Sequence, residues 1–309
     1  MSMWQNDNKD FERSLKSRET EEAIDMWFYR PVGYRMALMF NRIGFTPNAV
    51  TWIGILLGLM AGICFYFQDI YINLLGMFLL VWANLHDSAD GQLARITGIK
   101  TTLGRLLDGL CGDIWFICIY VAIAIRLTPE WGIYIYILGG AAGFLHARQA
   151  AMGDYHRNLH LYFLKGEKGS ELETSTDVKK TYNSYTFGRT LIYKLFFFFY
   201  LSYTKTQERW TPALQKMLKT IKAHYPTQNI PPQLREEFLL KSRPLIKYTN
   251  ILSFNTRVIA LFVSLLLNIP WAYFVFELTV MNIILAYMLC KYRLICKELT
   301  QRIENEEVE

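Results

Sequence analysis

The sequence predicts an all-α integral membrane protein with six transmembrane helices. Of the 309 residues, 52% are hydrophobic and only 19% are charged, a composition that favours burial in lipid over a soluble domain. The apolar residues are also clustered into runs of about 17 to 25, the length that a helix needs to cross the hydrocarbon core. The six runs are 49–67, 70–86, 107–126, 131–150, 251–268 and 270–290.

Basic residues predict how these helices are oriented. The chain has 33 Lys and Arg residues, and in the three short connections on one side of the membrane the only one is Arg126. Because cytoplasmic loops are enriched in Lys and Arg, we expect both termini and the aspartate-rich connection after the second span to face the cytoplasm. The expected location is the cytoplasmic or inner membrane of a prokaryote.

The chain begins with a polar tail, 1–20, in which we find no chemistry. In residues 21–45, apolar and aromatic side chains alternate with arginines at helical spacing, with a break near Pro31. This pattern is typical of an interfacial amphipathic helix in the headgroup layer, and equally of a helix packed on the membrane bundle. The first span then starts with Thr46 as a helix N-cap and Pro47 in the first turn.

Small residues and carboxylates mark the first three spans. Gly54, Gly58 and Gly62 recur every four residues in the first span, which predicts close approach of another helix. The second span ends in two aspartates, and a turn rich in threonine and glycine leads to two more at the start of the third. The four carboxylates are Asp87, Asp90, Asp108 and Asp113. We expect them to lie together at the cytoplasmic interface.

Clustered carboxylates repel one another unless cations neutralise them, and hard oxygen ligands select Mg²⁺, Mn²⁺ or Ca²⁺. A pair of divalent ions is a common device for phosphoryl chemistry, and one carboxylate can accept the proton of an attacking hydroxyl. Gly91 would let a nucleotide approach the backbone, and Arg95 could pair with a phosphate. The residues therefore predict phosphoryl transfer with two Mg²⁺ or Mn²⁺ ions.

This stretch resembles the signature of the CDP-alcohol phosphotransferases, also called CDP-alcohol phosphatidyltransferases. The pattern is Asp-x2-Asp-Gly-x2-Ala-Arg-x8-Gly-x3-Asp, here at Asp87, Asp90, Gly91, Ala94, Arg95, Gly104 and Asp108. The Thr-Pro-Asn-x-Val-Thr stretch that begins at Thr46 is also similar to that family, as are six spans with a cytoplasmic site. The resemblance covers about residues 25–155.

The resemblance implies roles for these residues. The implied metal ligands are Asp87, Asp90, Asp108 and Asp113, the last also acting as the general base. The implied contacts to the CDP group are Gly91, Ala94, Arg95, Gly104 and Asp90. The reaction would displace CMP from a CDP-linked alcohol, usually CDP-diacylglycerol, by the hydroxyl of a second alcohol in phospholipid synthesis. A homodimer is also implied, and the glycine-rich spans favour it.

The chain departs from the family in one spacing. The family separates its last two aspartates by four residues, whereas Asp108 and Asp113 are five apart and position 112 is Gly. On an α-helix, four residues leave two side chains about 40° apart, and five separate them by about 140°. We therefore predict a π-bulge that restores the facing of Asp113, made easier by Gly109 and Gly112.

Basic residues near the aspartates predict a pocket for an acceptor alcohol that carries its own phosphate, which favours an inositol or inositol-phosphate type. The candidate acceptor-binding residues are Lys100, Arg105, His146, Arg148 and Arg157. Snorkelling of the same basic side chains to lipid headgroups is the alternative.

The predicted domains follow from these patterns. After the catalytic transmembrane region 46–156 comes a basic cytoplasmic insertion, 157–247, then spans five and six in 248–297 and an acidic tail, 298–309. Lys216, Lys219 and Lys222 lie on a basic amphipathic helix that predicts either contact with an anionic membrane surface or a small cytosolic subdomain. Nucleic-acid binding is not expected, because the basic residues are spread among membrane-seeking ones.

Two other functions remain open at this stage. The first reverses the roles: a soluble CDP-alcohol, such as CDP-ethanolamine, CDP-choline or CDP-inositol, donates to diacylglycerol or ceramide. The motif is common to both directions, and assays with a panel of CDP-linked donors would separate them. The second is a non-catalytic membrane scaffold or cation transporter, since carboxylates in spans often mark ion pathways. Metal-dependent release of CMP that Asp90→Asn abolishes would exclude it.

Overall fold

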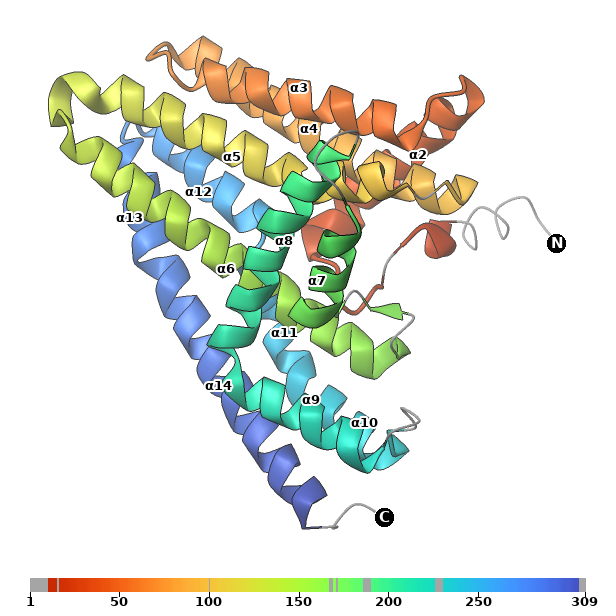
Figure 1. Cartoon of the computed structure of the whole chain (residues 1–309). Coiled ribbons are helices and arrows are strands. Elements are labelled where there is room, and N and C mark those ends of the chain that lie inside the picture. The colour runs from red at the N-terminus through yellow and green to blue at the C-terminus, as the bar shows by residue number, and fades with distance from the viewer. Residues whose placement is uncertain are drawn as a thin grey trace. The chain divides into compact units, whose positions relative to one another are not determined.

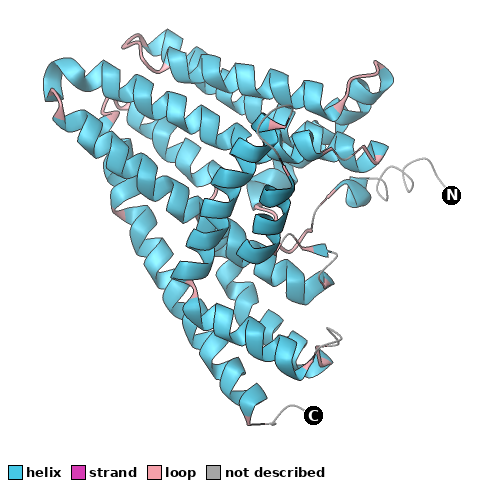
Figure 2. Ribbon diagram, viewed as in Figure 1, coloured by secondary structure: helices cyan, strands magenta, loops and turns pink. Residues whose placement is uncertain are grey.

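A computed structural model describes residues 11–15, 17–99, 101–166, 169–170, 172–185, 190–225 and 230–305. All regular secondary structure in these ranges is helical (Figure 1 and Figure 2), which confirms the predicted all-α membrane class. Five described segments are long and apolar enough to cross a membrane: Pro47–Cys64, Ile70–Thr97, Gly109–Trp131, Pro232–Leu266 and Trp271–Glu304. The span predicted at 131–150 is not among them, so the count of six stays a prediction.

The chain divides into two compact units. Unit 1 comprises Met1–Ala147 with Phe254–Thr279, and unit 2 comprises Arg148–Ser253 with Val280–Glu309. Unit 1 contains η1 (Asp25–Tyr29), α2 (Arg30–Arg42), α3 (Pro47–Cys64), α4 (Ile70–Thr97), α5 (Thr102–Trp131), α12 (Phe254–Leu266) and α13 (Trp271–Leu278). Helix α6 (Tyr134–Lys165) begins in unit 1 and continues into unit 2.

Three membrane helices of unit 1, α3, α4 and α5, pack closely because α3 is lined with glycine. A Cβ atom on Gly58 would lie 2.1 Å from Cδ1 of Trp115 on α5, and one on Gly62 would lie 2.7 Å from Sγ of Cys118. Gly54 faces α4 in the same way, with its Cβ position 3.3 Å from Cβ of His86. The predicted packing role of these glycines is confirmed.

The arginine-rich helix near the N-terminus packs on the bundle. Helix α2 contacts α4, and its buried Ala37 and Phe40 share a core cluster with Ala89 and Leu93 of α4. The predicted break near Pro31 is a π-helical turn, η1, that leads directly into α2. Of the two interpretations of this segment, the structure therefore supports packing on the bundle. Contact with the headgroup layer stays a prediction.

Unit 1 also buries charged residues between its helices. Arg257 of α12 donates a hydrogen bond from Nη1 to Oε2 of Glu277 on α13, and these side chains are 1% and 0% exposed. Oε1 of the same carboxylate lies 3.6 Å from Nδ1 of His146, which in turn is 3.2 Å from the hydroxyl of Tyr120 on α5. Mutual neutralisation is what makes a buried ion pair tolerable.

A second polar cluster joins the other ends of these helices. Arg126 lies inside α5 rather than in a connection, and its Nη1 donates to the Phe65 carbonyl and to Oδ1 of Asn73, at 3.3 Å each. Its Nη2 donates to Oδ1 of Asn268 at 3.1 Å. One guanidinium thus ties α5 to the end of α3, the start of α4 and the turn after α12.

Unit 2 contains α7 (Ser175–Ser184), α8 (Leu191–Trp210), α9 (Pro212–His224), α10 (Pro232–Ser242), η3 (Arg243–Leu245), α11 (Ile246–Ile251) and α14 (Val280–Glu304). Helix α9 has the predicted amphipathic pattern, but its apolar Leu214, Met217 and Ile221 are buried and the helix contacts α14. Its apolar face is therefore not available to a membrane surface. The subdomain interpretation of this helix is the one that the contacts support.

Candidate active site

Helix α4 carries the first half of the aspartate motif. Its start is capped by Asp69, whose Oδ1 accepts hydrogen bonds from the backbone N–H groups of Tyr71 and Ile72 at 2.8 and 3.0 Å. The helix ends at Gly98, whose φ of 72° lies in the left-handed region that favours glycine. Between these ends the helix is regular for 28 residues, so the motif residues keep fixed angular positions.

The two aspartates of α4 lie one helical turn apart. Asp90 is buried and Asp87 is half-buried, which places both carboxylates where water is scarce. A buried carboxylate needs hydrogen bonds or cations to remain ionised. Both aspartates take part in interactions within the protein. The arrangement matches the predicted face-sharing of this pair.

Gly91 and Arg95 lie side by side on the next turn of α4. A Cβ atom on Gly91 would be 3.3 Å from Nη2 of Arg95, so the guanidinium extends back along the half-buried glycine backbone. Nε of Arg95 donates to the carbonyl of Ser14, which fixes the side chain at its other edge. A guanidinium held beside bare backbone is a suitable site for a phosphate group.

The start of α3 and the start of α5 meet through threonine and asparagine side chains. Thr46 caps α3 as predicted, with its Oγ1 accepting from the N–H of Ala49 at 3.3 Å. Thr101 caps α5 by accepting from the N–H of Gly104 at 2.9 Å, and its hydroxyl donates to Oδ1 of Asn48 at 3.2 Å. A Cβ atom on Gly104 would be only 2.6 Å from that Oδ1.

Asn48 is a candidate site residue that the sequence reasoning missed. Its signal was present in the Thr-Pro-Asn-x-Val-Thr stretch, which predicted a helix start and a family resemblance but no role for Asn48. The side chain of Asn48 contacts both the cap of α5 and the glycine of the motif. An amide in this position can orient the backbone around Gly104.

Helix α5 carries the second half of the motif, and here one expectation is wrong. The predicted π-bulge between Asp108 and Asp113 is absent, because the described backbone is a regular α-helix from Thr102 to Trp131. Backbone hydrogen bonds of the α-helical type satisfy this segment without a bulge. The two aspartates therefore stay about 140° apart around the helix axis. Asp113 is exposed, and the side chain of Asp108 lies outside the described residues.

The glycines beside these aspartates face open space. A Cβ atom on Gly109 or on Gly112 would meet no atom of the described residues within 4 Å. Position 112 is four residues after Asp108, on nearly the same face of the helix. Within the described part of the chain, nothing occupies the space that a fourth carboxylate would need at position 112.

The predicted acceptor residues differ in their surroundings. His146 is buried against Glu277 and Tyr120 in unit 1, so it has a structural partner. Arg157 in unit 2 donates from Nη2 to Oδ1 of Asn250 at 3.2 Å, and Arg148 is half-buried. Lys100 and the side chain of Arg105 lie outside the described residues. Binding of the acceptor by these five residues stays a prediction.

The side chains at this site are of the type that binds a hard divalent cation. Asp87 and Asp90 supply carboxylate oxygens, which Mg²⁺ and Mn²⁺ prefer. No group of three His, Cys, Asp or Glu side chains able to hold a metal ion occurs among the described residues, a set that lacks the Asp108 side chain. The structure thus presents two ligands of the right type on α4, and the completion of the site from α5 stays a prediction.

Comparison with known proteins identifies the region that contains this site. Residues 45–159 match the family model of CDP-alcohol phosphatidyltransferase. This segment is therefore similar to the CDP-alcohol phosphatidyltransferase domain. The domain includes every motif residue from Asp87 to Asp113, and it confirms the family resemblance.

Two curated relatives match within this domain. The chain is 36% identical over 107 residues to archaetidylinositol phosphate synthase of Pyrococcus horikoshii, covering 35% of this chain and 55% of the relative. It is 29% identical over 99 residues to a bifunctional IPC transferase and DIPP synthase of Aquifex aeolicus, covering 32% of this chain and 22% of the relative. The chain spans about half the length of the first relative and less than a quarter of the second.

Proposed function

We propose that this protein transfers a phosphatidyl group from CDP-diacylglycerol to the hydroxyl of an inositol or inositol-phosphate type of alcohol, with release of CMP. The aspartates of α4 carry the proposal. Asp90 is buried and Asp87 half-buried near the end of a long apolar helix, where a lipid donor and a polar acceptor can meet. The name of the first relative, archaetidylinositol phosphate synthase, supports an inositol-type acceptor or product. Family membership supports the CDP-linked donor.

In the proposed mechanism, the motif residues hold the donor and move one proton. Divalent Mg²⁺ or Mn²⁺ bound at Asp87, Asp90 and Asp108 would offset the charge of the phosphate oxygens. Arg95 binds a phosphate of the CDP group, and the bare backbone at Gly91 and Gly104 allows the nucleotide to approach closely.

The proton of the acceptor hydroxyl passes to a carboxylate, for which Asp113 is the candidate. The acceptor oxygen then forms a bond to the phosphatidyl phosphorus, and the bond from that phosphorus to the oxygen of CMP breaks. CMP leaves with the electron pair of that bond. Asp113 does not share a face with Asp108 in the regular helix. To act as the base, Asp113 requires either a local change in α5 or an acceptor hydroxyl that approaches it on its own face of the helix.

The cytoplasmic orientation of the site and a homodimeric state belong to the same proposal. The distribution of Lys and Arg supports the orientation. The glycine-lined packing of α3 uses Gly54, Gly58 and Gly62 within the chain, so these glycines are not free to form a dimer interface. A dimer would therefore need another surface of the protein.

The proposal is tested by release of CMP from the purified full chain in detergent micelles with Mg²⁺. The donors are CDP-diacylglycerol, CDP-ethanolamine, CDP-choline and CDP-inositol, each with inositol, inositol phosphate, glycerol phosphate or diacylglycerol. We expect CMP from CDP-diacylglycerol, stimulated most by inositol or inositol phosphate and lost in Asp87→Asn. Asp177→Asn, at an exposed aspartate of α7, is the matched control and should leave the rate unchanged.

Two results would overturn the proposal. CMP formed only from a soluble CDP-alcohol together with diacylglycerol would reverse the roles of donor and acceptor. If no donor gives CMP, the unfolding temperature shows whether the protein is folded. A protein that unfolds at the same temperature as its variants and releases no CMP would favour a non-catalytic scaffold or a cation transporter.

A further inference from the structure

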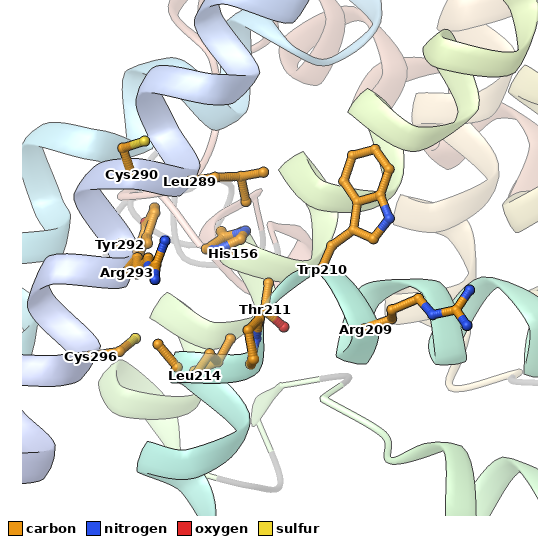
Figure 3. Close-up of a pocket in the computed structure, with 12 residues that line it drawn as sticks. His156, Arg209, Trp210, Thr211, Leu214, Leu289, Cys290, Tyr292, Arg293 and Cys296 are labelled. Atoms are coloured by element: carbon orange, nitrogen blue, oxygen red, sulfur yellow. The ribbon is translucent and has the colours of Figure 1, made fainter.

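Unit 2 contains a cavity of about 390 Å³ that the transferase site does not use (Figure 3). It lies between α14 and the junction of α8 with α9, and one residue of α6 completes its wall. Its volume falls within the range of small-molecule sites, about 300–1,000 Å³. All of its residues belong to unit 2, whereas the aspartate motif belongs to unit 1.

The wall of this cavity is apolar and deeply buried on one side. Leu214, Tyr292 and Cys296 line it, and each is at most 2% exposed. Leu289 of α14 adds a half-buried apolar surface. Such a lining favours the hydrocarbon part of a ligand, since burial of apolar surface is favourable and non-directional.

Two polar features interrupt this lining. The hydroxyl of Tyr292 is buried and has no hydrogen-bond partner within the described residues, which is uncommon for a buried polar atom. His156, buried beside it with ring centroids 4.3 Å apart, uses Nδ1 to contact the Met152 carbonyl at 2.8 Å. One of the residues that line the cavity therefore has a buried hydroxyl that is available to an oxygen acceptor of a ligand.

The rim of the cavity is cationic. Arg293 is exposed and lines the cavity from α14, and no carboxylate of the described residues forms an ion pair with it. In Figure 3 its side chain lies beside Tyr292, whereas Arg209 extends away from the other labelled residues. Arg293 is therefore the cation that faces a ligand in this cavity.

The setting of the cavity indicates which ligand reaches it. Helix α14 belongs to the candidate membrane span Trp271–Glu304. Helix α8 ends at Trp210 on the rim of the cavity, and its earlier turns carry Leu195, Phe198 and Phe199, each more than half exposed. Exposed aromatic and aliphatic side chains beside a basic residue are typical of the interface between hydrocarbon and headgroups.

We propose that this cavity binds one anionic phospholipid, with the headgroup phosphate at Arg293 and hydrocarbon against Leu214 and Leu289. Basic pockets beside membrane helices bind anionic headgroups in this manner. The lipid would be a bound component that holds α14 to the α8–α9 junction. This site does not depend on the proposed transferase function.

Native mass spectrometry of the purified full chain in detergent tests the proposal. The probes are phosphatidylglycerol, which is anionic, and phosphatidylcholine, which has no net charge. We expect one phosphatidylglycerol to bind at least about fivefold more tightly than phosphatidylcholine, because one Arg near an anionic headgroup contributes about 1 kcal/mol. Arg293→Gln should remove this preference, and Leu289→Trp, which fills the cavity, should weaken binding of both lipids.

Matched variants separate this cavity from other lipid sites. Lys297→Gln removes an exposed cation of the same helix that does not line the cavity, and it should leave binding unchanged. Unfolding temperatures identify variants that fail to fold, and Arg293→Gln, at an exposed position, should match the unchanged protein. The proposal is overturned if the two lipids bind equally, or if Asp90→Asn removes the lipid while Arg293→Gln retains it.

Discussion

The two halves of the aspartate motif lie on helices whose sequences determine the site to different degrees. The α4 half, Asp87–Arg95, lies within a regular helix with a defined start and end, and its side chains take the relative positions that their spacing implies. The α5 half, Gly104–Asp113, also lies within a regular helix, yet its last aspartate faces away from Asp108. One inserted residue rotates everything after it by about 100°. Motif spacing therefore specifies geometry only where no residue has been added.

The largest effect is expected in the α4 half. Asp90→Asn keeps the size of a buried side chain and removes a predicted metal ligand, which should cost several kcal/mol of transition-state stabilisation. We expect kcat/KM for CMP release to fall by about 10³-fold. Steady-state rates over a range of Mg²⁺ concentrations measure this loss. A variant with more than a tenth of the original activity would contradict the role of Asp90.

Two variants test whether the base of the α5 half lies at position 113 or at position 112. Asp113→Asn should lower kcat by about 10²-fold if Asp113 is the general base. Adding Gly112→Asp to that variant places a carboxylate at the family spacing, where a Cβ atom meets open space. Recovery of about tenfold would show that the site accepts a base from position 112. Unchanged activity in Asp113→Asn alone would mean that this residue is not the base.

A smaller effect is expected where the α5 half meets Asn48. Gly104→Ala puts a methyl group 2.6 Å from Oδ1 of Asn48, so the asparagine or the start of α5 has to move. We expect KM for the CDP-linked donor to rise roughly tenfold, since one ångström of misplacement costs about 10²-fold at most. Gly109→Ala, on the same helix with no atom within 4 Å, is the matched control. Equal effects of the two variants would remove Gly104 from the site.

Much of the fold followed from the sequence because it depends on local patterns. The apolar runs predicted the membrane helices, and Thr46 predicted a helix cap that the structure contains. The glycines of α3 predicted the close helix packing that is observed. The aspartate pair of α4 was predictable for the same reason. The two residues are three positions apart in one helix, and this separation determines their relative orientation. Each of these inferences involves neighbours in the sequence.

The sequence could not settle features that depend on partners distant in the chain. The apolar face of α9 fits a membrane surface or a protein surface equally well, and only its contact with α14 decides between them. The bulge at Asp113 was expected from the function of a family, whereas the backbone adopts the conformation with complete α-helical hydrogen bonding. The cavity at Arg293 combines residues from four helices, and no single segment carries a signal for it.

The ion pair between Arg257 and Glu277 has a consequence for the biogenesis of the protein. Helix α12 lies in the candidate membrane span Pro232–Leu266 and α13 in the next one, Trp271–Glu304, so each span contains one partner of the ion pair. Inserted alone, each would bring a charged side chain into hydrocarbon, at about 2.5–3.5 kcal/mol for such a group at the centre of a bilayer. Inserted as a hairpin, the two charges neutralise one another on entry. The translocation machinery should therefore release these two helices into lipid together.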